Sequence, residues 1–200
     1  KLDRILPLVE KPGRYIGREL GSVKKSTELP IRFLFAFPDV YEVGMSHLGM
    51  KILYHMLNER EDTVCERVFA PWDDMEQEMR KEGIPLLSME SYVPVKNFDF
   101  IGFTLQYEMS YSNIVNMLDL AGVPLRTAER TAGDPFVCCG GPCAYHAEPL
   151  SDFVDFFILG EGEEVNSEIM DVYKEWKNSG STDRDDFLMS IIPLGGVYVP

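Results

Sequence analysis

The chain has 200 residues, about one domain, and 45% of them are hydrophobic, which is enough for a sizeable core. Its formal net charge of −14 argues against nucleic acid or an anionic membrane surface as a partner, because Lys and Arg dominate the recognition of both. No apolar run reaches the ~20 residues of a spanning helix, and no signal-peptide pattern opens the sequence. A cytoplasmic protein is therefore expected.

The cysteines and the two chain ends give further bounds. The cysteines are Cys65, Cys138, Cys139 and Cys143. Such a set does not predict a small disulfide-stapled fold, so we expect all four to be reduced. The sequence starts at Lys1 without Met and stops at Pro200, directly after a strand-like run. We expect both ends to be cuts in a longer chain.

In chain order, residues 1–29 are mixed in character and predict an arm or short helix that packs on the domain. Ile31–Phe37 is a near-continuous apolar run, typical of a central parallel strand that is buried on both faces. Residues 48–57 then carry apolar side chains at helical spacing, and Ser46 is the predicted N-cap of that helix.

The same unit then repeats along the chain. Further strands are predicted at 63–69, 99–105, 136–139 and 154–159. Further helices are predicted at 73–82 with Asp73 as cap, at 114–121 with Ser112 or Asn113 as cap, and from Glu163 to 178. Gly83 and Gly122 are expected to end the first two of these helices. Residues 179–186 are predicted to be a polar loop.

Strands that alternate with helices indicate right-handed crossovers and a parallel sheet. We predict a flavodoxin-like, doubly wound α/β domain with five strands in the order 2-1-3-4-5 and an N-terminal arm. The predicted domain spans residues 30–178, and residues 179–200 are expected to be a linker and the start of a next domain. In such sheets a ligand binds beyond the carboxyl ends of the strands, where the first and third strands part.

Four loops should meet at that edge, namely 38–49, 104–113, 140–149 and 160–163. They gather glycines, where a ligand can approach the backbone, and the second carries several hydroxyl and amide groups. The first strand is not followed by Gly-x-Gly-x-x-Gly, and a Gly-Lys-Ser/Thr phosphate loop is missing. Common nucleotide sites are therefore disfavoured. A phosphorylatable receiver domain is disfavoured as well, because its acidic pair after the first strand is missing.

Certain motifs in these loops are familiar: Pro38-Asp-Val-Tyr-Glu-Val-Gly-Met-Ser-His-Leu-Gly49, residues 98–108, Gly140-Gly-Pro142 and Gly160-Glu-Gly-Glu163. Together they resemble the cobalamin-binding N-terminal domain of a family of cobalamin-dependent radical SAM proteins, over roughly residues 30–178. The resemblance implies a cobalamin-binding module that is not itself an enzyme. It implies a parent radical SAM enzyme, an Fe–S oxidoreductase or a methyltransferase-like protein of unread substrate.

The same resemblance implies a [4Fe–4S] cluster and S-adenosylmethionine in the parent, held by a radical SAM barrel of the same polypeptide, which would be the partner of this domain. The Cys-x3-Cys-x2-Cys motif that would hold the cluster is absent from this sequence. We therefore expect this chain alone to bind neither group and to have no methyl-transfer or S-adenosylmethionine cleavage activity.

The cobalamin tail is expected between the first and third strands, where Gly140 and Gly141 would let it pass close to the backbone. Bulk at Gly141, as in Gly141→Leu, is expected to block it without disturbing the fold. The expected cofactor-binding residues are Glu42, Gly44, Met45, Ser46, His47, Thr104, Gln106, Tyr107, Ser110, Gly140, Gly141, Pro142, Gly160, Glu161 and Gly162.

His47 is the candidate cobalt ligand. Methyltransferase-type cobalamin domains use Asp-x-His-x-x-Gly, but here Met45 replaces the Asp and the Gly comes one residue early. A helix N-terminus would keep His47 neutral, as a ligand must be, and Glu42 could replace the missing Asp. Because the partner that orients the ring is lost, we expect no histidine on the lower face of cobalt.

Three alternatives remain open. Cys139, Cys143 and His146 have the spacing Cys-x3-Cys-x2-His of a zinc or cluster site, although Cys139 also suits a buried strand position. The domain could have kept the fold, lost cobalamin and act only as a docking scaffold. A stand-alone hydrolase or transferase is disfavoured, because no nucleophile–base–acid set is visible.

Overall fold

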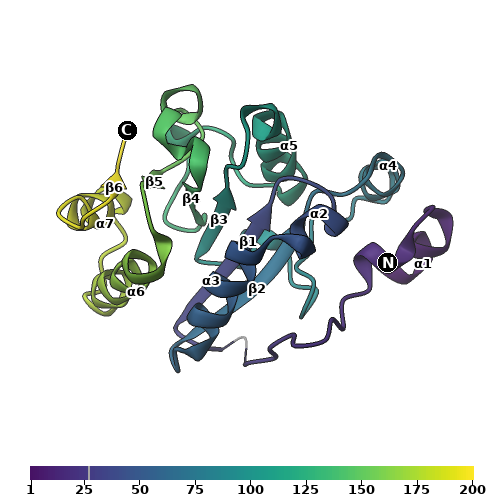
Figure 1. The fold of residues 1–200 in the computed structure, drawn as a ribbon, viewed down its shortest axis with the longest axis horizontal. Helices are drawn as coiled ribbons and strands as arrows, with labels where there is room; N and C mark the ends of the chain where they lie inside the picture. The colour runs from purple at the N-terminus through teal and green to yellow at the C-terminus, as the bar shows by residue number, and fades with distance from the viewer. Residues whose placement is uncertain (27) are drawn as a thin grey trace.

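The computed structural model describes residues 1–26 and 28–200, so Thr27 of the predicted arm lies outside the described residues. Its centre is a six-stranded sheet in the order β2-β1-β3-β4-β5-β6 (Figure 1). The strands are β1 Ile31–Phe37, β2 Thr63–Phe69, β3 Phe100–Thr104, β4 Phe136–Gly140, β5 Phe156–Ile158 and β6 Val197–Tyr198. The α-helices are α1 Leu2–Ile5, α2 Tyr41–Ser46, α3 Leu48–Glu59, α4 Asp73–Glu82, α5 Tyr111–Ala121, α6 Gly162–Asn178 and α7 Arg184–Ile191.

The predicted α/β class and the parallel order 2-1-3-4-5 are confirmed, but the sheet has six strands rather than five. The sixth strand, β6, pairs antiparallel with β5, so that Tyr198 lies opposite Phe157. It is reached through α7, whose Phe187 and Ile191 are fully buried. Helix α7 was not predicted, because its acidic first turn falls in residues 179–186, which were predicted to be a polar loop.

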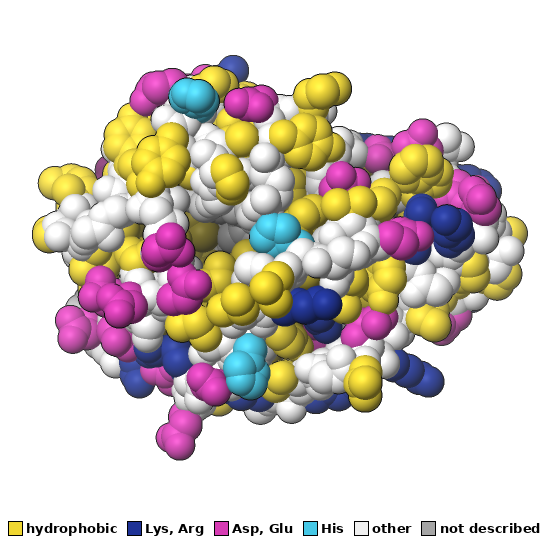
Figure 2. All heavy atoms as spheres, in the orientation of Figure 1, with side chains coloured by type: hydrophobic (Ala, Val, Ile, Leu, Met, Phe, Trp, Pro, Cys, Tyr) yellow, Lys and Arg dark blue, Asp and Glu magenta, His cyan; other side chains and the backbone are white. Residues whose placement is uncertain are grey.

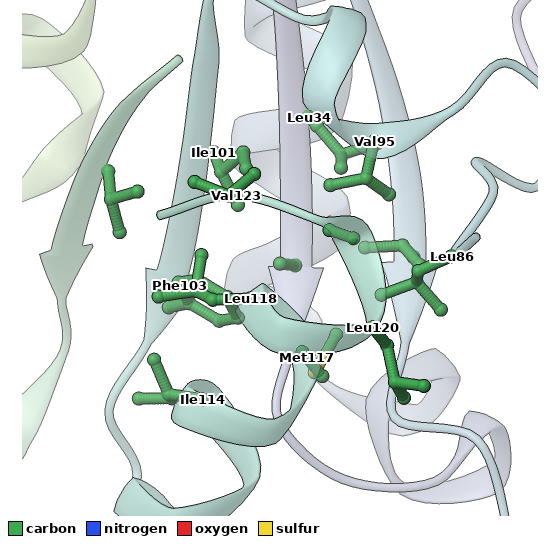
Figure 3. Close-up of a cluster of buried hydrophobic side chains, with 14 of the residues drawn as sticks. Leu34, Leu86, Val95, Ile101, Phe103, Ile114, Met117, Leu118, Leu120 and Val123 are labelled. Atoms are coloured by element: carbon green, nitrogen blue, oxygen red, sulfur yellow. The ribbon is translucent and has the colours of Figure 1, made fainter. Parts of the chain in front are cut away.

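Both faces of the sheet are covered, which explains the near-continuous apolar run of β1. Successive strand residues point to opposite faces. One core packs Leu34 and Ala36 of β1 against α1, α4 and α5, and the other packs Phe33 and Phe35 against α3, α6 and α7. Figure 3 shows part of the first core, where strand residues of β1 and β3 lie near those of α5.

The helix ends differ from the sequence prediction mainly after β1. The loop there contains the unpredicted helix α2, which ends at Ser46, and the N-cap of α3 is His47. The N-cap of α5 is Ser110, without a side-chain hydrogen bond, and α4 begins after Trp72. The left-handed caps Gly83 and Gly122 are confirmed. Among the described residues no helix combines the length and apolar character that a membrane crossing needs.

Strand β2 stands at the edge of the sheet and has a neighbouring strand, β1, on one side only. It is nevertheless buried along its whole length. Lys25 of the arm donates to the carbonyl of Thr63 at 3.0 Å. The segment after α4 covers the strand further along, because Met89 N donates to the carbonyl of Arg67 at 2.9 Å and Glu90 accepts from Arg67 N at 2.8 Å. The arm and this segment together close the β2 edge.

Candidate functional site

A cleft opens at the carboxyl ends of β1, β3, β4 and β5, between the beginnings of α3 and α6. Its volume is about 390 Å³. Figure 2 shows the hollow on the face that Figure 1 presents. The site lies at the sheet edge where the chain order reverses between β1 and β3, which is where ligands bind in open α/β sheets.

The floor of the cleft is apolar. Alternation along the strands turns Phe33, Phe35, Cys138 and Ile158 toward it. Gly102 of β3 belongs to the same floor, and a Cβ built there would lie 2.5 Å from Cζ of Phe33. The glycine therefore leaves the space that the Phe33 ring occupies.

Nine of the fifteen residues that the sequence assigned to the site line this cleft: His47, Thr104, Gln106, Gly140, Gly141, Pro142, Gly160, Glu161 and Gly162. They come from four different loops, so the topology brings together what the sequence separates.

The other six predicted residues do not line the cleft. Four lie in the unpredicted helix α2, namely Glu42, Gly44, Met45 and Ser46, and the other two are Tyr107 and Ser110. Gly44 is buried against the ring of Phe69, and Met45 Sδ lies 3.5 Å from Arg67 Nη1. Ser46 Oγ turns back to donate to the carbonyl of Glu42 at 2.7 Å.

The remaining three of these six also have partners elsewhere. Glu42 forms an ion pair with Arg14 of the arm at 2.9 Å, so it does not orient His47. Ser110 Oγ donates to the carbonyl of Tyr107 at 2.8 Å, and the Tyr107 hydroxyl lies 3.5 Å from Asp39.

Sequence reasoning missed the floor and parts of both helical walls. The missed lining residues are Phe33, Phe35, Gly49, Met50, Leu53, Gly102, Phe103, Cys138, Cys139, Ile158, Glu163 and Asn166. Strand alternation counted back from Thr104 and Gly140 would have found Gly102 and Cys138, because residues two apart share a face. The opening between α3 and α6 has no comparable signal in the sequence.

His47 holds the first turn of α3. Its Nδ1 accepts a hydrogen bond from Met50 N at 3.1 Å, and its ring lies 5.4 Å from that of Phe37, centroid to centroid. A Cβ at Gly49 would come within 3.1 Å of His47 Cε1. The N-cap of α3 is therefore the imidazole of His47 and not Ser46, which the sequence predicted. The ring lies at the wall of the cleft.

Other polar side chains of the cleft are only partly used. Thr104 Oγ1 accepts from Gln106 Nε2 at 2.6 Å, which leaves the Thr104 hydroxyl hydrogen and the Gln106 carbonyl oxygen for another group. Asn166 of α6 donates to the carbonyl of Gly162 at 2.6 Å and keeps its side-chain oxygen. The cleft thus offers donors and acceptors above an apolar floor.

Two glycines beside the cleft differ in what they tolerate. Gly141 has φ +97°, and a Cβ there would lie 3.0 Å from both the Leu105 carbonyl oxygen and Thr104 Oγ1. Gly141→Leu would therefore strain the backbone, contrary to the expectation that it leaves the fold intact. A Cβ at Gly140 would make only ordinary contacts, 3.7 Å from the carbonyl oxygen of Ile158.

The cysteines do not form a metal centre. All four are free thiols, and burial raises the pKa of Cys138 and of Cys139 far above the usual value. Cys139 borders the cleft, but its side chain packs into the core on the α1, α4 and α5 side of the sheet, while His146 is exposed. Within residues 1–26 and 28–200 no three His, Cys, Asp or Glu side chains are arranged to hold a metal ion.

Comparison with known proteins gives the family. The family of N-terminal regions of radical SAM proteins matches residues 49–200, about three quarters of the chain. An uncharacterized protein of Methanocaldococcus jannaschii is 26% identical over 128 residues, which are 64% of this chain and 23% of that protein. The chain thus spans about a quarter of that relative, and no solved structure matches it. The chain belongs to the family of N-terminal domains of radical SAM proteins.

Proposed function

We propose that this domain binds cobalamin and takes the nucleotide tail of the cofactor into the cleft between α3 and α6. The observation that carries the proposal is the position of the cleft, an apolar-floored space of about 390 Å³ at the switch between β1 and β3. The loop motifs that resemble cobalamin-binding domains, above all Gly140-Gly-Pro142 and Gly160-Glu-Gly-Glu163, border the same space.

The residues of the cleft suit the parts of the tail. The flat, apolar benzimidazole matches a floor of Phe33, Phe35 and Ile158. The ribose and phosphodiester match the unused polar atoms of Thr104 and Gln106. A Cβ at Gly140 would make only ordinary contacts with Ile158, so a side chain would fit there and take up part of the cleft.

Cobalamin would supply a carrier for a methyl group or a one-electron centre. The residues of this chain would bind and orient the tail and keep water from it. We further propose that a longer protein supplies the radical SAM barrel, with a [4Fe–4S] cluster and S-adenosylmethionine, as a partner within the same polypeptide. Family membership and the archaeal relative, of which the matched segment is only 23%, support this part.

A titration followed by visible spectroscopy tests the proposal. Hydroxocobalamin should shift its absorption on binding the wild-type chain. Gly140→Val places a branched side chain in the cleft and should weaken binding at least tenfold, because the floor can no longer be reached. Gly195→Val is the matched control, since a Cβ at Gly195 has no neighbour within 4 Å.

The variants must first be shown to fold, by circular dichroism and thermal unfolding. Equal affinity of Gly140→Val and the wild-type chain would contradict the placement of the tail. A wild-type chain that leaves the spectrum unchanged would contradict cobalamin binding altogether.

The second candidate function is docking without a bound ligand. Large exposed apolar side chains on the segments that border the cleft favour it, because they mark a surface suited to contact: Leu48 at 69%, Met109 at 83% and Tyr145 at 68% exposure. A docking scaffold would leave the cobalamin spectrum unchanged and still bind the separately expressed barrel of the longer protein.

A further inference from the structure

The hydrogen bond that His47 makes at the start of α3 fixes the state of its ring. Met50 N is a donor and cannot accept, so Nδ1 must present its lone pair. A neutral imidazole then carries its hydrogen on Nε2. A hydrogen on Nδ1 would instead set two N–H groups against each other.

The other side of the ring is free for a ligand. Among the described residues no hydrogen bond reaches Nε2 of His47, and the side chain is half-buried in the wall of the cleft. The ring of Phe37 packs on one side of the imidazole, and Gly49, which has no side chain, leaves room for the ring on the other. The Nε2–H is therefore a fixed donor beside the space proposed for the tail.

We propose that His47 is a specificity-determining hydrogen-bond donor, whose Nε2–H binds an oxygen of the nucleotide tail and which does not ligate cobalt. The inference rests on the proposed function. A ring nitrogen that carries a hydrogen has no lone pair for a metal. To free the lone pair of Nε2, the hydrogen would have to move to Nδ1, and this would break the hydrogen bond that caps α3. The acceptor is assigned to the tail, because His47 lines the space above the floor that takes the tail.

Two variants separate the cap from the donor. His47→Ser keeps an N-cap oxygen for α3 but loses Nε2–H, whereas His47→Ala loses both. His47→Ser should bind hydroxocobalamin about three- to tenfold more weakly than the wild-type chain, the effect of one hydrogen bond. Hydroxocobinamide, which lacks the nucleotide tail, should bind both proteins equally.

Nitrogen-15 NMR of the ligand-free protein, with the His47→Ser spectrum for assignment, should show the Nε2–H tautomer. An Nδ1–H tautomer, equal cobalamin affinity of His47→Ser and wild type, or an equal loss with cobinamide would overturn the inference. So would nitrogen superhyperfine splitting of bound cob(II)alamin that disappears in His47→Ala. A wild-type chain that binds no cobalamin would instead overturn the proposed function, and the inference with it.

Discussion

The two ends of the sheet use polar side chains in opposite ways. At the amino pole, where Asp62, Asp99 and Asp155 precede β2, β3 and β5, each carboxylate is held by several donors of the same chain. At the carboxyl pole, the loops that border the cleft leave Thr104, Gln106 and His47 with unused hydrogen-bonding atoms. The carboxylates at the amino pole join the helices to the strands, whereas the polar side chains at the carboxyl pole keep atoms that can bind a ligand.

Asp155 shows how completely the amino pole is satisfied. It accepts from Arg130 at 2.7 Å, from Arg184 of α7 at 3.1 Å and from Val137 N at 2.7 Å. Asp99 accepts from Arg32 N, Tyr173 and Lys177 at 2.7 to 2.9 Å. These groups join α6, α7 and the strands, so the amino pole should carry more of the stability than the carboxyl pole.

The largest effect is expected from Asp155→Ala. The Arg130 guanidinium is fully buried, and without its partner it would remain as an uncompensated charge. We expect a loss of about 3–5 kcal/mol in the free energy of unfolding, measured with urea. Glu108→Ala, an exposed acid at the carboxyl pole, should change it by less than about 0.5 kcal/mol. Similar losses in both variants would remove the contrast between the poles.

A smaller, pH-dependent effect is expected from Asp62→Asn. Burial alone would raise the pKa of Asp62, but hydrogen bonds from Lys174, Arg60 and Thr63 outweigh it and hold that pKa well below the usual value. A depressed pKa stabilises the fold above the unfolded pKa of about 4, and this contribution disappears as the pH falls through the folded pKa.

At neutral pH, Asp62→Asn should therefore cost about 1.5–3 kcal/mol. The gap to the wild-type protein should shrink in urea titrations as the pH is lowered below about 4. A gap that stays constant down to the acid limit would show that the hydrogen bonds to Asp62 do not depend on its charge.

The smallest effect belongs to the carboxyl pole itself. His47→Ala removes the cap of α3 and should cost about 0.5–1 kcal/mol, while His47→Ser should stay within about 0.5 kcal/mol of the wild-type protein. Thermal unfolding of the two variants side by side measures the difference. An equal loss in both would mean that the packing of the ring against Phe37, rather than the cap, is what stabilises the helix.

The strands could be predicted from the sequence because burial on both faces demands apolar runs. Ile31–Phe37 and Thr63–Phe69 were predicted with the bounds that the structure has. Helix α7 was missed because only two of its side chains, Phe187 and Ile191, are buried and its first turn is acidic. A short amphipathic helix that follows a polar stretch has too little periodicity to be recognised.

The site could be predicted in part. Thr104, Gly140 and Gly160 line the cleft together, because the ends of parallel strands must meet. Glu42 and Met45 do not line the cleft, because the loop after β1 folds into α2, which turns them toward the arm and β2. Whether two helices leave a gap depends on their packing, and that is set by contacts distant in the sequence.

The closed edge of β2 bears on how this domain behaves in concentrated solution. A sheet edge with free N–H and C=O groups is a template for another strand and so for aggregation. On the β2 side, Lys25 of the arm and the segment around Met89 already occupy such groups. At the other edge β6 has two residues, and Pro200 close after it has no N–H to donate. Trimming the arm would therefore free the carbonyl of Thr63 at this edge for another strand.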